Sequence, residues 1–411
     1  MPRGSRGLGS SFNGLWFATG TANLGDGIVL FSLPLLALSA GASDGLVALT
    51  ITLATIAWPL FGIHGGWFVD RVGATRILRG ANLVRGLALL GLAVAVAFGA
   101  LSFWLVASVA VLYGIAEVLV DTALVSTVAS TVIPAQRGRA NARIEATINV
   151  ANQFLGSPIA GALIVLGNVF AVAAGGVLYL LALVGVGFVR RVSVAEAVEV
   201  PDNRIRAGMS FLWKNLTLRW LTVINAGMNL VWGMWEAVIV LYIVAPGPLG
   251  HTPFEFGLLL AGMAVGGLAA SLVFPWLRTR LGIAVLLSVD VIGTALLPLA
   301  PALGLGFWWV LAAAALAAAG SSTWRILMST IRQHQTPEYL LGRVYSASRV
   351  VSWGAVPVGA ALASVLVTVF GLPGVFTVAT GIAIVVIVGF VVFAVRHPLT
   401  GADGEPVSSA R

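Results

Sequence analysis

The chain has 411 residues, of which 59% are hydrophobic and only 9% are charged, and its mean hydropathy is +1.01. A soluble domain with this balance would expose large apolar patches, so the surroundings must be lipid. Cysteine is absent and the four histidines are scattered, which argues against disulfides, thiol catalysis and a metalloenzyme. The net charge of +8 could suggest nucleic acid, but the basic residues lie in short gaps between apolar runs, which indicates membrane topology.

Apolar runs of about 20 residues, the length that one membrane crossing needs, recur along the chain. They predict an all-α integral membrane protein with twelve spans. Six spans form an N-terminal half, residues 1–189, and lie near 13–39, 45–69, 80–100, 102–132, 144–166 and 169–189. The first run follows two arginines but is too long for a secretory signal, so it is interpreted as the first span.

A polar segment, residues 190–216, interrupts the hydropathy and is predicted to be a cytoplasmic linker. The C-terminal half, residues 217–395, is predicted to hold six more spans, near 217–245, 255–277, 282–303, 306–333, 345–370 and 372–395. Residues 396–411 are expected to form a disordered cytoplasmic tail.

Arginine and lysine together number 23 and are unevenly distributed. If the N-terminus is inside, all 23 fall in the tails, in cytoplasmic loops, or on helices toward their cytoplasmic ends. The gaps on the other side contain none. This pattern fits an even number of spans and predicts a multi-pass protein of the inner or plasma membrane, with both termini cytoplasmic.

A weak internal repeat supports two pseudo-symmetric halves. Residues 66–73, after span two, and 275–282, after span eight, share a tryptophan, an arginine and a final glycine. Residues 156–161 in span five are similar to 354–359 in span eleven. Duplication of a six-helix unit explains both matches.

A glycine-rich basic segment lies where spans two and three are predicted to join. It resembles the signature loop of the major facilitator superfamily, through Gly66, Asp70, Arg71, Gly73 and Arg76. The resemblance implies a gating motif, with close helix packing at the glycines and the Asp70 charge pairing with an arginine or facing a helix N-terminus. For Arg76 and Arg79, an ordinary basic cytoplasmic loop remains the alternative interpretation.

Three further segments narrow the resemblance to one branch. Residues 23–28, residues 114–117 with Asp121, and residues 331–337 with Gly342 and Arg343 are similar to the macrolide-efflux and siderophore-exporter branch. This resemblance implies a proton-coupled antiporter that exports amphipathic small molecules. Span four lacks the internal arginine that many proton-coupled drug exporters carry, which weakens the case for proton coupling.

Ionisable residues fall on spans one, four, seven and ten, and such groups inside a bilayer usually mark a pathway. They are Asp26, Glu117 with Asp121, Glu236, and Arg325. The resemblance implies that these four helices line a central cavity. Glu117 and Asp121 share one face of span four, where mutual repulsion favours an exchangeable proton. We hypothesise that Asp26, Glu117 and Asp121 exchange protons, with Glu236 as the near-symmetric partner of Asp26 and Arg325 as counter-ion. For Glu117, a static interhelical hydrogen bond is an equal alternative.

Aromatic and amide side chains on the same helices are candidate substrate contacts for an apolar or amphipathic ligand, although each ring alone fits ordinary packing. They are Trp16, Asn225, Asn229, Trp232, Trp235 and Trp324.

Other classes of protein fit the sequence less well. No phosphate-binding loop and no catalytic constellation is present, so we expect neither a cofactor nor an enzyme. The expected partners are a small amphipathic substrate, protons and the lipid bilayer, with no nucleic acid, and the expected state is a monomer. A lipid flippase or a facilitated-diffusion carrier of the same fold remains an alternative.

Overall fold

The computed structural model describes residues 8–62, 65–133, 136–190, 204–337 and 340–397. These residues are almost entirely helical, with turns between the helices and one isolated bridge between Val244 and His251. The chain divides into two compact units: Met1–Glu199 with Thr252–Ala261, and Val200–His251 with Gly262–Arg411.

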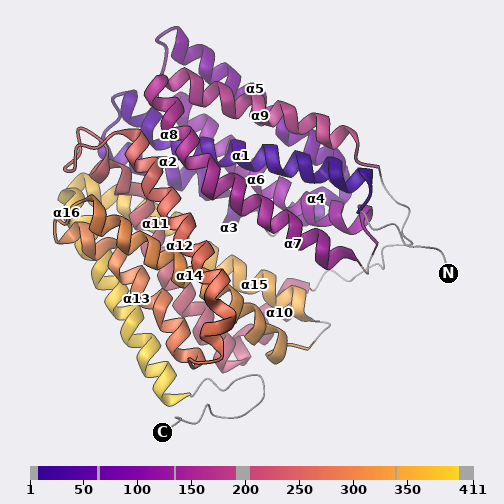
Figure 1. Ribbon diagram of the computed structural model, residues 1–411, viewed down its shortest axis with the longest axis vertical. Helices are drawn as coiled ribbons and strands as arrows, with labels where there is room; N and C mark the ends of the chain where they lie inside the picture. The colour runs from indigo at the N-terminus through magenta and orange to yellow at the C-terminus, as the bar shows by residue number, and fades with distance from the viewer. Residues whose placement is uncertain (1–7, 63–64, 134–135, 191–203, 338–339, 398–411) are drawn as a thin grey trace. The chain divides into compact units, whose positions relative to one another are not determined.

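The first unit is built around α1, which packs along α9, and α5, which packs against both α6 and α9 (Figure 1). Its helices are α1 Ser10–Ser39, α2 Asp44–Thr55, α3 Ala57–Phe61, α4 Gly65–Val72, α5 Ala74–Ala97, α6 Phe103–Thr131, α7 Arg137–Ile148, the π-helix η2 Asn149–Gly156, α8 Ser157–Leu166 and α9 Asn168–Gly187. The predicted second span is therefore broken near Ile56, and the fifth contains a π-helical segment.

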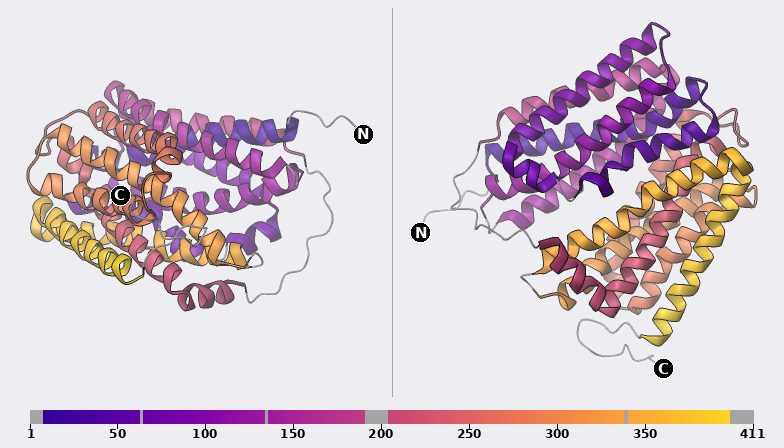
Figure 2. Two further views of the ribbon diagram at one scale, coloured as in Figure 1. Left: turned by 60° about the horizontal axis from the view of Figure 1, so that its bottom comes forward. Right: turned by 180° about the vertical axis from the view of Figure 1, so that it is seen from behind.

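The second unit is built around α11, which packs along α16 and α13 (Figure 2). Its helices are α10 Arg204–Lys214, α11 Leu216–Ile243, α12 Pro253–Arg278, α13 Ile283–Ala302, α14 Phe307–Gln335, α15 Leu341–Trp353 and α16 Ala355–Arg396, and the first turns of α12 belong to the first unit. Within the predicted linker, residues 204–214 are helical. Residues 191–203, and the predicted tail from residue 398 onward, lie outside the described residues.

Eleven helices in the described residues are long and apolar enough to cross a membrane. The last candidate runs from Arg343 to Arg396 over 54 residues. A straight helix of that length would measure about 80 Å, whereas the hydrocarbon core of a bilayer is only about 30 Å thick. Gly371 breaks this run with a left-handed φ of 66°. The run thus provides two crossings, and the twelve-span prediction is confirmed.

The segment predicted to be a gating loop is mostly helical, which corrects the expected loop. Residues 65–72 form α4, and α5 begins at Ala74, so Gly73 alone separates the two helices. Gly73 adopts a φ of 97°, a conformation that favours glycine. Arg76 and Arg71 are exposed, and the Arg76 guanidinium lies 3.5 Å from the carbonyl oxygen of Val72. The Asp70 side chain and the burial of Gly66 lie outside the described part of the structure.

Candidate functional site

A buried arginine organises the centre of the first unit. Arg85 lies midway along α5 and is only 1% exposed. Its Nη1 donates to Asp26 Oδ1 on α1 and to Glu117 Oε2 on α6, each at 2.8 Å. Its Nη2 donates to Asn82 Oδ1 at 2.9 Å. A buried guanidinium requires such partners because an unpaired charge in an apolar interior is costly.

A tyrosine from a fourth helix completes this group of residues. The Tyr179 hydroxyl on α9 donates to Asp26 Oδ1 at 2.5 Å, and the Arg85 guanidinium lies 4.3 Å from the centre of the Tyr179 ring. We call Asp26, Asn82, Arg85, Glu117 and Tyr179 the Arg85 cluster. It ties α1, α5, α6 and α9 together through side chains that are up to 153 residues apart in sequence.

Glycines allow these helices to approach one another closely. A Cβ added to Gly25 on α1 would lie 3.3 Å from the Tyr179 ring. One added to Gly86, next to Arg85, would lie 2.7 Å from the Leu180 side chain on α9. Small residues at helix crossings are the usual means of close packing in membranes. Here they bring the tyrosine within reach of the ion pairs.

The two carboxylates that bind Arg85 differ in exposure. The Asp26 side chain is 2% exposed, whereas that of Glu117 is 19% exposed. Asp121, one turn further along α6, interacts electrostatically with both of them. One guanidinium therefore faces at least two carboxylates, so the cluster carries an excess negative charge when both acids are ionised. Binding of one proton would cancel that charge, and Glu117 offers the more accessible oxygen.

The π-helix η2 touches α1 directly beside the Arg85 cluster. A Cβ on Gly27 would overlap the carbonyl oxygen of Asn152 and lie 3.0 Å from the Cα of Gly156. Gly27 follows Asp26 in sequence, so the π-helix contacts the same turn of α1 that carries the Asp26 carboxylate. Segments of π-helix within α-helices occur frequently at functional sites. A movement of span five would therefore displace the backbone of α1 next to Asp26.

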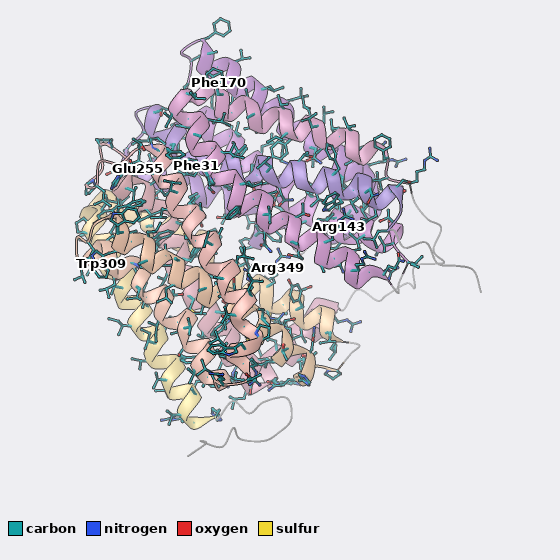
Figure 3. The ribbon with its side chains drawn as sticks, in the orientation of Figure 1. Phe31, Arg143, Phe170, Glu255, Trp309 and Arg349 are labelled. Carbon is teal, nitrogen blue, oxygen red and sulfur yellow. The ribbon has the colours of Figure 1, made fainter. Side chains whose placement is uncertain are left out.

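The predicted cavity residue Trp16 takes part in a contact between α1 and α7. Its Nε1 donates to Thr147 Oγ1 at 2.5 Å, and the guanidinium of Arg143 lies 3.8 Å from its ring centre. Figure 3 labels Arg143 on α7. The ring thus packs against span five, and its role as a substrate contact stays a prediction.

The predicted residues of the second unit fall into two groups. Asn225, Asn229, Trp232 and Glu236 are each partly exposed on α11. Trp235 and Trp324, in contrast, are 1% and 2% exposed, and neither indole N–H has an acceptor among the described residues. Trp324 packs into a hydrophobic core with Leu221, Met228, Ile283, Leu286 and Leu287. A substrate contact for these two buried rings stays a prediction.

Arg85 is not among the residues predicted from the sequence, where Arg325 is the expected counter-ion. Arg85 binds both Asp26 and Glu117, whereas Arg325 is exposed in the second unit, with its Nη2 3.4 Å from Ser322 Oγ. The positive-inside pattern assigns Arg85 to the cytoplasmic end of its span and so does not mark it as a site residue. Its position midway along an apolar helix was the available signal.

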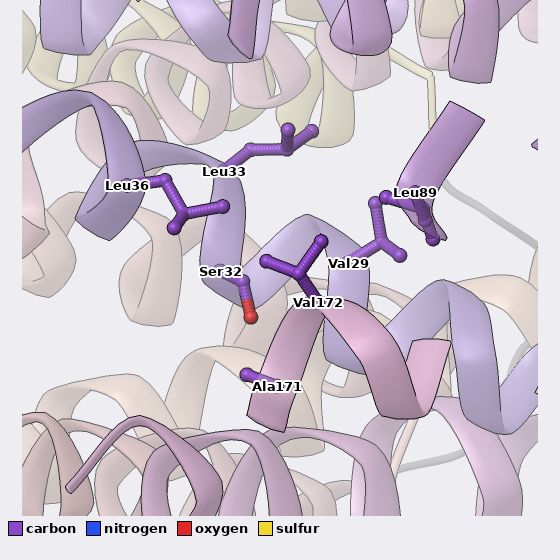
Figure 4. Close-up of a pocket in the computed structure, with 7 residues that line it drawn as sticks. All are labelled: Val29, Ser32, Leu33, Leu36, Leu89, Ala171 and Val172. Atoms are coloured by element: carbon purple, nitrogen blue, oxygen red, sulfur yellow. The ribbon is translucent and has the colours of Figure 1, made fainter. Parts of the chain in front are cut away.

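A small cavity lies about one turn away from the cluster, between α1, α5 and α9 (Figure 4). Its volume is about 10 Å³, and its lining consists of Val29, Ser32, Leu33, Leu36, Leu89, Ala171 and Val172. The Ser32 hydroxyl donates to the Ile28 carbonyl oxygen at 2.6 Å. Such an apolar space holds at most one water and is too small for a substrate. Among the described residues, no three His, Cys, Asp or Glu side chains gather as metal ligands.

Comparison with known proteins places this geometry in a family. An uncharacterised MFS-type transporter of Sinorhizobium fredii, y4rN, is 29% identical over 181 residues, which are 43% of this chain and 45% of the relative. The alignment thus spans less than half of the relative's length.

Solved structures show the same fold. A POT family transporter in complex with a thioalcohol-conjugated peptide superposes with a TM-score of 0.72 at 13% identity, covering 94% of this chain and 96% of the other. A bacterial homologue of the iron transporter ferroportin, in an inward-facing state, gives a TM-score of 0.72 at 18% identity, covering 93% and 98%. The sequence profile described as Major Facilitator Superfamily matches residues 15–355. With its twelve spans, the chain therefore belongs to the major facilitator superfamily of membrane transporters.

Proposed function

We propose that this chain is a secondary active transporter that exports an amphipathic small molecule in exchange for protons by alternating access. It acts in the inner or plasma membrane, with both termini in the cytoplasm. The similarity of three segments to macrolide and siderophore exporters suggests the type of substrate. The observation that carries the proposal is the Arg85 cluster, because it holds more acidic than basic groups inside the membrane-spanning helices.

The charge balance of the cluster supports proton coupling. Two carboxylates share one guanidinium nitrogen, so full ionisation leaves a negative charge in surroundings of low dielectric constant, which is costly. A proton that enters at Glu117 makes the cluster neutral, and its release restores the charge. Because the cluster joins four helices, each step changes the electrostatic attraction between them. A protonated and an ionised state can therefore favour different arrangements of the helices.

The test is transport in everted membrane vesicles with an imposed pH gradient, using fluorescent dyes and siderophores as substrates. The variants are Asp26→Asn and Glu117→Gln, each of which removes one negative charge. The matched control is Glu145→Gln, because Glu145 is an exposed carboxylate on α7 outside the cluster. We expect both cluster variants to lose gradient-driven accumulation about tenfold or more while they keep substrate exchange at equal pH. The control should behave like the native chain.

Two outcomes would contradict this proposal. If native transport ignores the pH gradient, facilitated diffusion or lipid flipping by the same fold becomes the better account. If transport follows the gradient but both cluster variants couple normally, proton coupling resides elsewhere in the chain.

A further inference from the structure

A line of polar and aromatic side chains runs along α11 in the second unit. Asn225, Asn229, Trp232 and Glu236 are spaced by four, three and four residues, so they share one face of the helix. Each is partly exposed, as are Ala226, Gly227 and Leu230, whereas Met228, Val231, Met234 and Trp235 are buried. We call these four residues the α11 polar face. A face of this composition is costly to present to lipid, so it is expected to face the interior of the helix bundle or a water-filled cavity.

Glu236 differs from the acids of the Arg85 cluster in its partners. Its Oε2 accepts a hydrogen bond from Trp232 Nε1 at 3.1 Å. Among the described residues, Glu236 forms no ion pair, since the ion pairs there join Arg85 to Asp26 and to Glu117. Glu236 lies seven residues before the end of α11, within the apolar stretch. A membrane carboxylate with a neutral donor but no cation is electrostatically incomplete.

The neighbouring tryptophans provide the second element of a cation site. Trp232 is partly exposed, and its ring centre lies 5.5 Å from that of Trp235, with an angle of 42° between the rings. Because Trp235 is buried, it fixes the position of Trp232. The hydrogen bond from Trp232 Nε1 to Glu236 Oε2 also restrains the Trp232 ring. A carboxylate beside an immobilised tryptophan face is the chemistry that recognises organic cations, through charge pairing and cation–π attraction.

We infer that the α11 polar face binds the cationic group of the substrate, with Glu236 as its counter-ion and Trp232 as its aromatic partner. This inference rests on the proposed transport function and makes its substrate class more specific. The substrate is an organic cation with apolar substituents, such as a protonated or quaternary amine. Asn225 and Asn229 extend the face by two turns and provide polar contacts beyond the cationic group. Asn229 is held in place, since its Nδ2 donates to the Ser352 carbonyl oxygen at 2.9 Å.

Glu236 distinguishes between cationic and anionic substrates, both of which the sequence leaves open. Cationic amphiphiles are complementary to Glu236, whereas anionic chelators of the siderophore type are repelled by it. Glu236 thus also has a different role from the predicted proton exchange. In this proposal the Arg85 cluster exchanges the protons, and the α11 polar face binds the cationic group of the substrate.

The test is equilibrium binding to the purified full chain in nanodiscs at a single pH, followed by tryptophan fluorescence, with empty nanodiscs subtracted. The probes are tetraphenylphosphonium and tetraphenylborate, which have nearly the same size and shape but opposite charge. We expect the native chain to bind the cation at least about tenfold more tightly than the anion. Glu236→Gln should weaken cation binding about tenfold or more, and Glu145→Gln should leave it unchanged. Trp232→Leu should weaken it by about fivefold, and Trp232→Phe by less.

The inference is overturned if Glu236→Gln binds the cation within about twofold of the native chain, or if the anion binds the native chain as tightly as the cation. Thermal unfolding of each variant checks that it is folded. If Glu236→Gln does not fold, the cation affinities of Trp232→Leu and Trp232→Phe decide. A site without cation–π attraction would bind the cation equally well in both variants, and that result would overturn the inference. Asp26→Asn separates the two proposals, since it should lose proton coupling and still bind tetraphenylphosphonium. Glu236-dependent binding without proton coupling would leave this inference standing and contradict the proposed function.

Discussion

Replacing Arg85 by glutamine provides the most direct test of how the first unit is held together. The change removes the only cation bound to Asp26 and Glu117 in the described residues, together with the contact to the Tyr179 ring. Breaking a buried ion pair by removing one partner costs about 3–5 kcal/mol, because the remaining charge stays buried without compensation. Since Arg85 is 1% exposed, solvent cannot replace it, and we expect a loss of about that size.

Reversible unfolding in mixed micelles, followed by the fluorescence of the thirteen tryptophans, measures this loss. A double-mutant cycle apportions it between the two acids. We expect Arg85 to couple more strongly to Asp26 than to Glu117, because the Asp26 side chain is 2% exposed and that of Glu117 is 19% exposed. The deficit of Arg85→Gln should shrink at acidic pH, where protons neutralise the abandoned carboxylates. An unchanged unfolding free energy, or strict additivity with Asp26→Asn, would refute the reasoning.

Three further changes test two contacts and the membrane orientation. Tyr179→Phe removes the hydroxyl that donates to Asp26 and should cost about 1.5–3 kcal/mol in the same unfolding assay, and no loss would mean that the hydrogen bond is unimportant. Gly27→Ala forces a Cβ into the π-helix and should lower the free energy of unfolding by about 1–3 kcal/mol. Gly80→Ala is the control, because a Cβ there meets nothing within 4 Å, and it should leave the stability unchanged. Equal losses in both variants would exclude close packing as the cause. The chain contains no cysteine, so Ala100→Cys can be labelled alone: we expect a membrane-impermeant maleimide to reach it from outside intact cells, and labelling only after permeabilisation would reverse the proposed orientation.

The sequence by itself determined the membrane class and the number of spans. Runs of apolar residues report burial in lipid directly, because each crossing must satisfy its own backbone hydrogen bonds within the helix. The same logic singled out Asp26 and Glu117, since an acid inside a bilayer is costly without a purpose. It also placed Asn225, Asn229, Trp232 and Glu236 among the candidates, although their shared exposure on α11 is known only from the structure.

The tertiary structure alone decided which charges meet. Arg85 is 59 residues from Asp26 and 32 from Glu117 in sequence, and Tyr179 is 153 from Asp26. Hydropathy and charge patterns act along the chain and contain no information about which helix packs beside which. The same limit applies to the tryptophans: Trp232 and Trp235 are three residues apart, yet one is partly exposed and the other is buried. Which face of a helix is buried depends on the neighbouring helices. In a chain that is apolar throughout, only the packing distinguishes a buried face from an exposed one.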